Sequence, residues 1–350
     1  MLYGKTNPHG GDIYEKRIAI DFSENTNPFG TPERVKDAVR CAVDDMCHYP
    51  DPYARELVKA ISEHEEVDSS DLLIGNGAAE LIYSYVRAVS PKKVLELGPT
   101  FSEYREASEN AGAEVDTYIL SEDNEFTLTE DFSGYLKGKQ YDVIFLCNPN
   151  NPTGKLIDKD LILNILDCAK EDNTRVFLDE CFVSLSEDAY TMKDYLDSYP
   201  NLFILRAFTK DYALAGVRLG YCMTGDHALL KKMSDTVQGW NVSVLAQAAG
   251  LAALKEDEFL ENSRKEIFRE KEWMKNELEK LGFKVFSSKA NYLLFKGDEA
   301  LSAVLKEKGI LIRDCRNYRG LGPGFYRIGI KDRARNTVLL EELERINRIG

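Results

Sequence analysis

The chain has 350 residues, 43% of them hydrophobic and 30% charged, a composition typical of a globular protein and a length sufficient for two domains. Lysine and arginine number 45 and aspartate and glutamate 59, so the formal net charge is −14. A negative field of this size repels phosphate backbones and disfavours a nucleic-acid partner. Any anionic substrate must then be held by local positive groups.

The longest apolar stretches, such as 142–147 and 202–207, have the length of strands and fall short of the about 20 residues that cross a bilayer. No apolar run follows residues 1–5, so we expect no secretory signal, no membrane partner and a cytoplasmic protein. The seven cysteines contain no C-x-x-C pair, which indicates reduced thiols. The four histidines lie far apart in the sequence, so we expect no metal site.

The N-terminal arm, through Gly30, carries turn residues rather than a periodic pattern. Residues 31–33 then open a predicted helix, with Thr31 as its N-cap and Pro32 in its first turn. Beyond this helix, amphipathic stretches alternate with apolar runs that we expect to form strands, at 72–74, 93–97, 142–146, 175–178 and 202–205. This alternation favours an α/β fold in which helices cover both faces of a mostly parallel sheet, with ligands at the carboxyl ends of the strands.

A long helix rich in Glu, Lys and Arg begins near Glu256. Short apolar runs then alternate with helical stretches, which indicates a smaller α+β domain. The expected strands there are 283–286, 291–295, 309–313 and 325–330. We therefore predict three segments: residues 1–45 form the N-terminal arm and part of the small domain, 46–260 the large domain, and 261–350 the C-terminal small domain.

Two of the predicted strands end in residues that suit an anionic ligand. Residues 75–80 open a helix with small side chains, so its backbone N–H groups can approach a phosphate; taken alone, they also fit an ordinary turn. Glu80 stands where a dinucleotide-binding fingerprint requires a small residue, so a nicotinamide cofactor is disfavoured. Residues 148–154 follow another strand and, taken alone, fit a rigid turn.

Two further strands end in ionisable residues. Asp179 ends the strand 175–178, where a buried carboxylate needs a cationic partner, although such a residue can also cap a loop or helix. Lys210 follows the strand 202–205. Most lysines are solvated surface charges, but burial at a strand end lowers the pKa of the amine and lets it form an imine.

In this order, the segments 151–154, Asp179, Thr209-Lys210 and Arg218-x-Gly220-Tyr221 resemble the motifs of the class I/II aminotransferases, enzymes of fold type I that use pyridoxal phosphate (PLP). The resemblance spans nearly the whole chain and implies that the large domain binds PLP. It implies that Lys210 forms a Schiff base with PLP and later moves the proton at the substrate carbon. It also implies that Asp179 keeps the ring nitrogen protonated, so that the ring withdraws electrons.

The resemblance implies further contacts to the cofactor. Asn151 donates to the phenolic oxygen of the ring, and Phe101 stacks on the ring. Tyr49 reaches the phosphate of the other subunit, which implies a homodimer with shared active sites. The residues implied to hold the phosphate within one chain are Ala78, Ala79, Thr209 and Arg218. The sequence departs from many relatives at two positions, where Phe182 replaces a tyrosine and Ala207 replaces a hydroxyl-bearing residue.

Near the start of the chain stand the segments 9–13, 21–23 and Asn25-x-Asn27-Pro28-x-Gly30, and near its end stand 309–321 and Tyr326-Arg327. These segments resemble the ends of the threonine-phosphate decarboxylases of cobalamin synthesis, and match the related histidinol-phosphate aminotransferases less well. The resemblance implies that Arg327 binds the carboxylate of the substrate, for which a planar guanidinium is suited. Arg313 and His9 are candidates for a substrate phosphate, and Asn27 in the arm is a further candidate contact. Arg313 also fits a solvated edge, and His9 also fits a loose tail.

PLP cleaves whichever bond at the α-carbon stands perpendicular to its ring. A perpendicular carboxylate gives decarboxylation, here of L-threonine O-phosphate to aminopropanol phosphate and carbon dioxide, and a perpendicular hydrogen gives transamination. The sequence does not encode these angles, so we favour the decarboxylase and keep the aminotransferase open. A third hypothesis is a non-catalytic binding protein with the PLP-enzyme fold. The presence of Lys210 and Asp179 argues against it.

Overall fold

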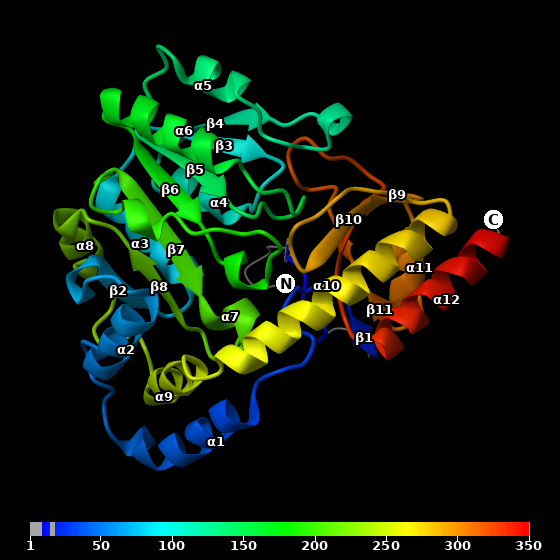
Figure 1. The fold of residues 1–350 in the computed structure, drawn as a ribbon, viewed down its shortest axis with the longest axis horizontal. Helices are drawn as coiled ribbons and strands as arrows, with labels where there is room; N and C mark the ends of the chain where they lie inside the picture. Colours follow the sequence, from blue (N-terminus) through cyan, green and yellow to red (C-terminus); the bar gives the residue numbers. More distant parts are fainter. Residues whose placement is uncertain (1–8, 15–17, 350) are drawn as a thin grey trace.

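The protein is described here by a computed structural model that covers residues 9–14 and 18–349 (Figure 1). Residues 1–5, from which the lack of a secretory signal was argued, lie outside the described residues. A seven-stranded sheet has the order β2-β8-β7-β6-β5-β3-β4, a four-stranded sheet the order β12-β13-β10-β9, and β1 pairs with β11. Among the described residues, no helix combines the length and apolar character of a membrane span.

The large sheet contains β2 (Leu72–Gly75), β3 (Lys93–Gly98), β4 (Glu114–Ile119), β5 (Val143–Cys147), β6 (Arg175–Asp179), β7 (Leu202–Ala207) and β8 (Gly220–Met223). Strand β8 runs antiparallel to both of its neighbours, and the other pairings are parallel. The five strands expected in this region are confirmed. Strands β4 and β8 were not expected, because β4 is a partly exposed edge strand with polar residues and β8 is short, begins with a glycine and contains no β-branched side chain.

Helices cover both faces of this sheet, as predicted. They are α1 (Glu33–Ala42), α2 (Arg55–Glu65), α3 (Ala78–Val89), α4 (Glu103–Asn110), α5 (Asp131–Leu136), α6 (Lys159–Glu171), α7 (Phe208–Asp211), α8 (His227–Ser234) and α9 (Val244–Ala253). In β5, Val143 and Phe145 face the core cluster shared with α3, α4 and α8, whereas Ile144 and Leu146 face the cluster shared with α2, α5, α6 and α9. Burial on both faces explains the nearly continuous apolar runs.

The prediction for the start of α1 was wrong in its cap. The helix begins at Glu33, but Pro32 immediately precedes it in an extended conformation and no side chain caps it. The hydroxyl of Thr31 instead donates to the carbonyl oxygen of Ala213 at 3.1 Å. The side chain that the local pattern assigned to the helix end therefore makes a tertiary contact instead.

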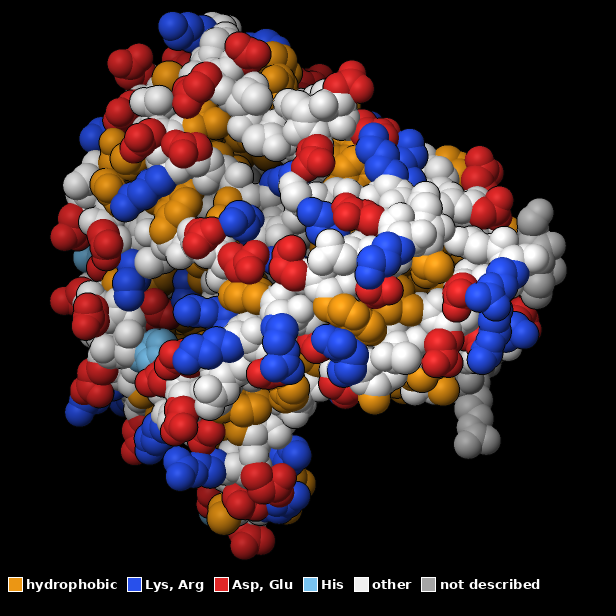
Figure 2. All heavy atoms as spheres, turned by 45° about the vertical axis from the view of Figure 1, so that its right-hand side comes forward, with side chains coloured by type: hydrophobic (Ala, Val, Ile, Leu, Met, Phe, Trp, Pro, Cys, Tyr) orange, Lys and Arg blue, Asp and Glu red, His pale blue; other side chains and the backbone are white. Residues whose placement is uncertain are grey.

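Helix α1 lies at the bottom of the molecule in Figure 1. The part of the surface that projects downward in Figure 2 carries interspersed acidic and basic side chains.

The C-terminal part is built around the four-stranded sheet. Its elements are α10 (Asp257–Lys280), β9 (Lys284–Val285), β10 (Tyr292–Lys296), α11 (Leu301–Glu307), β11 (Ile310–Leu311), β12 (Arg313–Asp314), β13 (Phe325–Gly329) and α12 (Arg333–Ile349). Helix α10 is the long charged helix expected from the sequence, and in Figure 1 it runs from the large sheet to this smaller sheet.

The N-terminal arm lies between the two main sheets. Strand β1 (Ile20–Asp21) pairs in parallel with β11, and the N–H of Asn27 donates to the carbonyl oxygen of Lys210 at 2.8 Å. A Cβ on Gly329 would lie 2.2 Å from the carbonyl oxygen of Glu24, so only glycine lets the arm pass over β13 this closely. The arm therefore brings residues from the start of the chain to the carboxyl end of β7.

Candidate functional site

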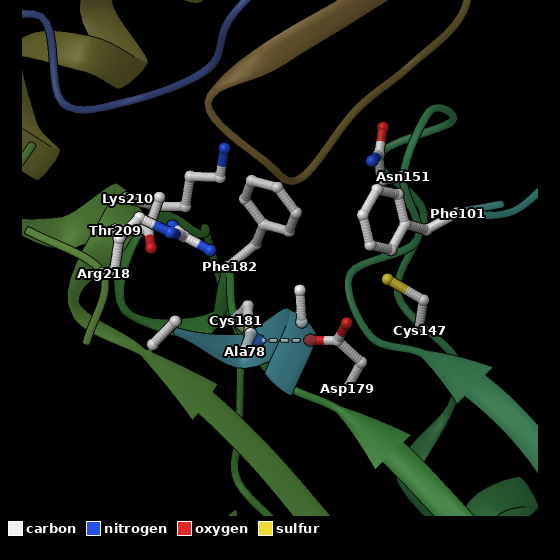
Figure 3. A pocket seen from close by; sticks show the side chains of 12 residues that line it. Ala78, Phe101, Cys147, Asn151, Asp179, Cys181, Phe182, Thr209, Lys210 and Arg218 are labelled. Atoms are coloured by element: carbon white, nitrogen blue, oxygen red, sulfur yellow. Dashed lines mark hydrogen bonds between the residues drawn. The ribbon is translucent and has the colours of Figure 1, made fainter. Parts of the chain in front are cut away.

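A cavity of about 180 Å³ lies at the carboxyl ends of β5, β6 and β7, beside the start of α3. Figure 3 shows Lys210, Thr209 and Arg218 on one side of it and Phe101 and Asn151 on the other. Every residue that the resemblance assigned to the cofactor within one chain lines this cavity. The lining residues are Ala78, Ala79, Phe101, Cys147, Asn151, Asp179, Cys181, Phe182, Ala207, Thr209, Lys210 and Arg218.

One end of the cavity is suited to a phosphate. Helix α3 begins there at Ala78, directly after Gly77, whose φ is +84°. A Cβ on Gly77 would lie 2.5 Å from the Nη2 atom of Arg218, and a Cβ on Gly220 would lie 2.9 Å from the backbone nitrogen of Ala78. Gly77 thus lets the guanidinium approach the positive end of the helix, and Gly220 lets the backbone of β8 do so. With the hydroxyl of Thr209 nearby, these donors fit the phosphate group of PLP.

Asp179 ends β6, and both of its carboxylate oxygens accept a hydrogen bond. Oδ1 accepts from the backbone N–H of Cys181 at 2.9 Å, shown in Figure 3, and Oδ2 accepts from the hydroxyl of Tyr104 at 2.6 Å. Burial raises the pKa of Asp179, and these hydrogen bonds oppose the rise. A buried carboxylate in this state is stabilised by a cation, and the protonated ring nitrogen of PLP fits that requirement.

Lys210 lies on the short helix α7, directly after β7, and lines the cavity. Its Nζ donates to Oδ1 of Asn25 at 2.9 Å and lies 5.5 Å from the centre of the Phe182 ring. Burial, assisted by the positive charge of Arg327, lowers the pKa of Lys210 to about 8. A substantial fraction of this amine is therefore neutral near physiological pH, which is the form that attacks an aldehyde.

Arg327, on β13, lies next to Asn151 and joins the two main sheets at the cavity. The guanidinium donates to Oδ1 of Asn151 and to the carbonyl oxygen of Ser23, and its buried Nε has no hydrogen-bond partner among the described residues. This unsatisfied donor fits an anionic group of a ligand. Arg313 is the cross-strand partner of Arg327 in the register of β12 and β13, so the two side chains leave the same face of the sheet. It donates to Oδ1 of Asn317 at 2.8 Å and does not line the cavity.

His9 lies at the edge of the cavity. Its ring centre is 5.7 Å from that of Phe101, and its Nε2 is 2.8 Å from Oε1 of Glu103. With Glu106, these two residues offer metal-ligand atoms that all lie within 4.8 Å of one another. The spacing of the histidines in the sequence gave no sign of this group, because its members come together only through the fold. The role of His9 toward a substrate phosphate stays a prediction.

Asn27 and Tyr49 do not line the cavity of this chain. The side-chain amide of Asn27 donates to the carbonyl oxygen of Asp211 at 2.9 Å, and its Oδ1 accepts from the N–H of Phe29 at 3.1 Å. These bonds anchor the arm, and a contact between Asn27 and the substrate stays a prediction. Tyr49 is 80% exposed and packs on Trp240, with 4.9 Å between the ring centres.

Sequence reasoning missed two residues that touch the predicted machinery, Asn25 and Tyr104. Asn25 lies in the N-terminal arm, two residues before Asn27, but the sequence did not reveal which asparagine of the arm would reach Lys210. Tyr104 follows Phe101, a predicted contact of the ring, by three residues, and this short separation could have suggested a shared role. Phe182 lines the cavity and packs edge-on against Tyr292 at 5.2 Å between ring centres.

Comparison with known proteins identifies the family of the chain. The family model for aminotransferase class I and II matches residues 17–343. The chain is 33% identical, over 97% of its length and 96% of the relative, to the threonine-phosphate decarboxylase of Salmonella typhimurium.

Two solved structures share its fold over nearly their whole length. The histidinol-phosphate aminotransferase of Clostridium acetobutylicum is 30% identical with a TM-score of 0.88, over 95% of this chain and 100% of that one. The L-threonine-O-3-phosphate decarboxylase of Porphyromonas gingivalis is 26% identical with a TM-score of 0.84, over 94% and 99% of the two chains. The chain therefore belongs to the aminotransferase class I and II family, and its cavity fits the PLP cofactor of that family.

Proposed function

We propose that this protein is a PLP-dependent decarboxylase of a phosphorylated amino acid, with L-threonine O-phosphate as substrate and aminopropanol phosphate and carbon dioxide as products. One observation carries the proposal: the amine of Lys210, the carboxylate of Asp179 and the anion site at the start of α3 line the same cavity. The extent of the similarity to a threonine-phosphate decarboxylase supports the choice of substrate.

PLP, when bound, withdraws electrons from the α-carbon of an amino acid joined to it. Asp179 holds the ring nitrogen in its protonated form, and the donors beside Gly77 hold the phosphate. Arg327 binds the carboxylate of the substrate through its guanidinium, which Asn151 and Ser23 orient. In decarboxylation, the bond between the α-carbon and the carboxylate breaks and its electron pair stays on the α-carbon. A proton from the ammonium form of Lys210, which becomes the neutral amine, then takes the place of carbon dioxide.

The phosphate of the substrate needs positive groups, because the chain as a whole is negative. Arg313 leaves the same sheet face as Arg327, and His9 stands at the edge of the cavity. We propose both as phosphate ligands, with His9 exchanging Glu103 for the phosphate when the substrate enters. Asn27 would support them by fixing the arm to the backbone that follows Lys210.

Transamination of histidinol phosphate is the second candidate, favoured by the similarity to the Clostridium acetobutylicum aminotransferase. The protein, loaded with PLP, would be incubated with L-threonine O-phosphate, with L-serine O-phosphate, and with histidinol phosphate plus 2-oxoglutarate. Carbon dioxide without glutamate supports the decarboxylase. Glutamate formed from histidinol phosphate would replace it with the aminotransferase. Neither product from any of the three would show that the substrate class is wrong.

The enzyme assignment has a separate test that needs no substrate. The purified protein with PLP should be yellow, and borohydride should bleach it and fix the cofactor to Lys210. Lys210→Ala should lose this adduct, while Lys231→Ala, which removes an exposed lysine, should retain it. A protein that stays colourless with added PLP would contradict its assignment as a PLP-dependent enzyme and would favour a non-catalytic binding protein.

We also propose that the protein is a homodimer in which Tyr49 reaches the cofactor phosphate of the partner subunit. Tyr49 and Tyr53 are both mostly exposed, and Tyr49 packs on the half-exposed Trp240. Met46 and Val43 extend this exposed apolar surface. A second copy of the chain would cover these side chains and complete the phosphate site.

A further inference from the structure

Tyr104, on α4, joins two parts of the cavity that are far apart in the sequence. Its side chain is fully buried, and its hydroxyl donates to Oδ2 of Asp179 at 2.6 Å. Its ring meets the Phe101 ring edge-on, with 5.7 Å between the centres, and stacks on Phe145 at 5.1 Å. One side chain thus supports both a wall of the cavity and the carboxylate that lines it.

The two hydrogen bonds to Asp179 differ in origin. The bond from Cys181 N–H is local, since Cys181 is two residues further along the chain. The bond from Tyr104 spans 75 residues and forms only when α4 is packed on the large sheet, so that its tyrosine reaches the end of β6. Without it, Oδ2 would lose the donor that the fold supplies to a buried carboxylate oxygen, a costly arrangement in a protein interior.

The surroundings of Asp179 keep the hydroxyl of Tyr104 protonated, so that it continues to donate its hydrogen bond. The titratable groups that face the carboxylate are Tyr104, Cys147, Cys181, Lys210 and Tyr292. Burial and the neighbouring carboxylate raise the pKa of Tyr104 well above its ordinary value, so the hydroxyl keeps its proton throughout the physiological range.

We propose that Tyr104 is the positioning residue that holds Asp179 ionised and turned toward the cavity, so that this carboxylate meets the ring nitrogen of the cofactor. The proposal rests on the proposed function only through the identity of the cofactor, and it holds for either substrate. Because the hydroxyl donates to the charged carboxylate, its loss destabilises the ionised form of Asp179 more than the protonated form.

The chain supplies a matched control in Tyr85. This residue is also fully buried, and it packs against the same phenylalanines, with ring centres 6.2 Å from Phe145 and 4.9 Å from Phe177. Its hydroxyl has no hydrogen-bond partner among the described residues. Tyr85→Phe therefore removes a hydroxyl from the same aromatic cluster without removing a hydrogen bond, whereas Tyr104→Phe removes the bond to Asp179.

The first measurement is the melting temperature of the full chain without cofactor, near pH 5 and near pH 8. Tyr104→Phe should melt below wild type, with a deficit that is larger near pH 8, where more of Asp179 is ionised. Tyr85→Phe should differ little from wild type at either pH. A deficit for Tyr104→Phe that is the same at both pH values would indicate a packing role and overturn the proposal.

The second measurement is the dissociation constant of PLP in a double-mutant cycle with Asp179→Asn. Tyr104→Phe alone should weaken binding about tenfold, the size expected for a hydrogen bond to a charged group. In the Asp179→Asn background, Tyr104→Phe should add little further loss, because the charged partner is already gone. Equal losses in both backgrounds would contradict the proposal.

The two measurements separate this proposal from the proposed function. A wild-type chain that fails to bind PLP would remove the cofactor assignment and with it the proposed role of Tyr104 toward the cofactor. A chain that binds PLP but gives pH-independent melting and additive losses would keep the proposed function and reject the positioning role.

Discussion

The amine of Lys210 donates a hydrogen bond to Oδ1 of Asn25 at 2.9 Å, across 185 residues of sequence. Asn25 is buried, its carbonyl oxygen accepts from Nδ2 of Asn291 at 2.8 Å, and its own Nδ2 has no partner among the described residues. The acceptor is a neutral amide on an arm whose other hydrogen bonds to the backbone of Lys210 and Asp211 do not involve the Lys210 amine. The arm therefore places an acceptor beside the amine without adding a charge.

Substitutions of Asn25 should change the protonation of Lys210 in opposite directions. Asn25→Asp puts an anion beside the ammonium and should raise the pKa of Lys210, so that labelling of the amine near neutral pH slows about tenfold. Asn25→Ala removes an acceptor from the charged form and should lower the pKa and speed labelling. The measurement is the pH dependence of modification of Lys210 by an amine-specific reagent in the cofactor-free chain, followed by mass spectrometry.

Thr26→Val provides the control for this pair of variants. The Thr26 hydroxyl lies in the same segment but contacts Glu24, at 3.3 Å, and makes no hydrogen bond to Lys210. Its labelling profile should match that of wild type. Profiles that are indistinguishable among Asn25→Asp, Asn25→Ala and wild type would show that the hydrogen bond does not act on the amine.

Gly77→Ala should weaken the binding of PLP by about tenfold or more without unfolding the protein. The new methyl group would stand 2.5 Å from Nη2 of Arg218, so the guanidinium must move away from the start of α3, and a φ of +84° adds strain. The measurement is a titration of the cofactor by absorbance. Gly112→Ala shares a positive φ, +83°, but its methyl group would meet no atom within 4 Å. Gly112→Ala should therefore bind PLP as tightly as wild type. An equal loss of affinity for PLP in the two variants would show that the contact with Arg218 is not the cause.

A buried cluster of charged side chains around Arg206 should contribute strongly to the stability of the folded protein. Arg206, on β7, donates to Oε2 of Glu180 at 3.1 Å and to Oε1 of Glu65 at 3.3 Å. Arg206→Met leaves two buried carboxylates without their main cation and should lower the free energy of unfolding by about 3–5 kcal/mol, measured by urea denaturation. Arg348→Met breaks only an exposed pair with Glu344 and should change it by less than about 1 kcal/mol.

The same cluster sets a dependence of stability on pH. Burial acts to raise the pKa of Glu65, but the charge of Arg206 and hydrogen bonds from His64 and Tyr221 outweigh it and hold the pKa well below its ordinary value. Since the folded pKa is depressed, this contribution to stability is present near neutral pH and is lost as the pH falls through the acid range below about pH 4. In Arg206→Met the loss should begin at a higher pH. If the free energy of unfolding of Arg206→Met fell with pH over the same range as that of wild type, this account would be contradicted.

Trp240→Glu should convert the proposed dimer into monomers of 39.6 kDa, measured by light scattering. Trp240 is half-exposed and packs on Tyr49, so a charge there would be buried without a partner when two chains associate. Val338→Glu changes another exposed apolar residue, on α12, and should leave the mass unchanged. A wild-type protein that is already monomeric would reject the shared site.

The sequence by itself determined the parallel core, the positions of its main strands and most of the cavity lining. Buried strands such as β5 and β6 read as continuous apolar runs, and their carboxyl ends carry residues whose chemistry is legible without a fold. Their places after apolar strands made Asp179 and Lys210 candidates, and the resemblance to the class I/II aminotransferases, carried by motifs in the same order, gave these two residues their roles.

The tertiary structure alone decided which distant side chains meet these groups. Asn25 reaches Lys210 because the arm passes over Gly329. Tyr104 reaches Asp179 because α4 packs on the sheet. The hydroxyl of Thr31 donates to the backbone of Ala213 instead of capping the helix. Such contacts depend on the packing of whole elements, whereas a sequence pattern records only neighbours along the chain. Local periodicity therefore identified the reactive groups, and packing selected the residues that orient them.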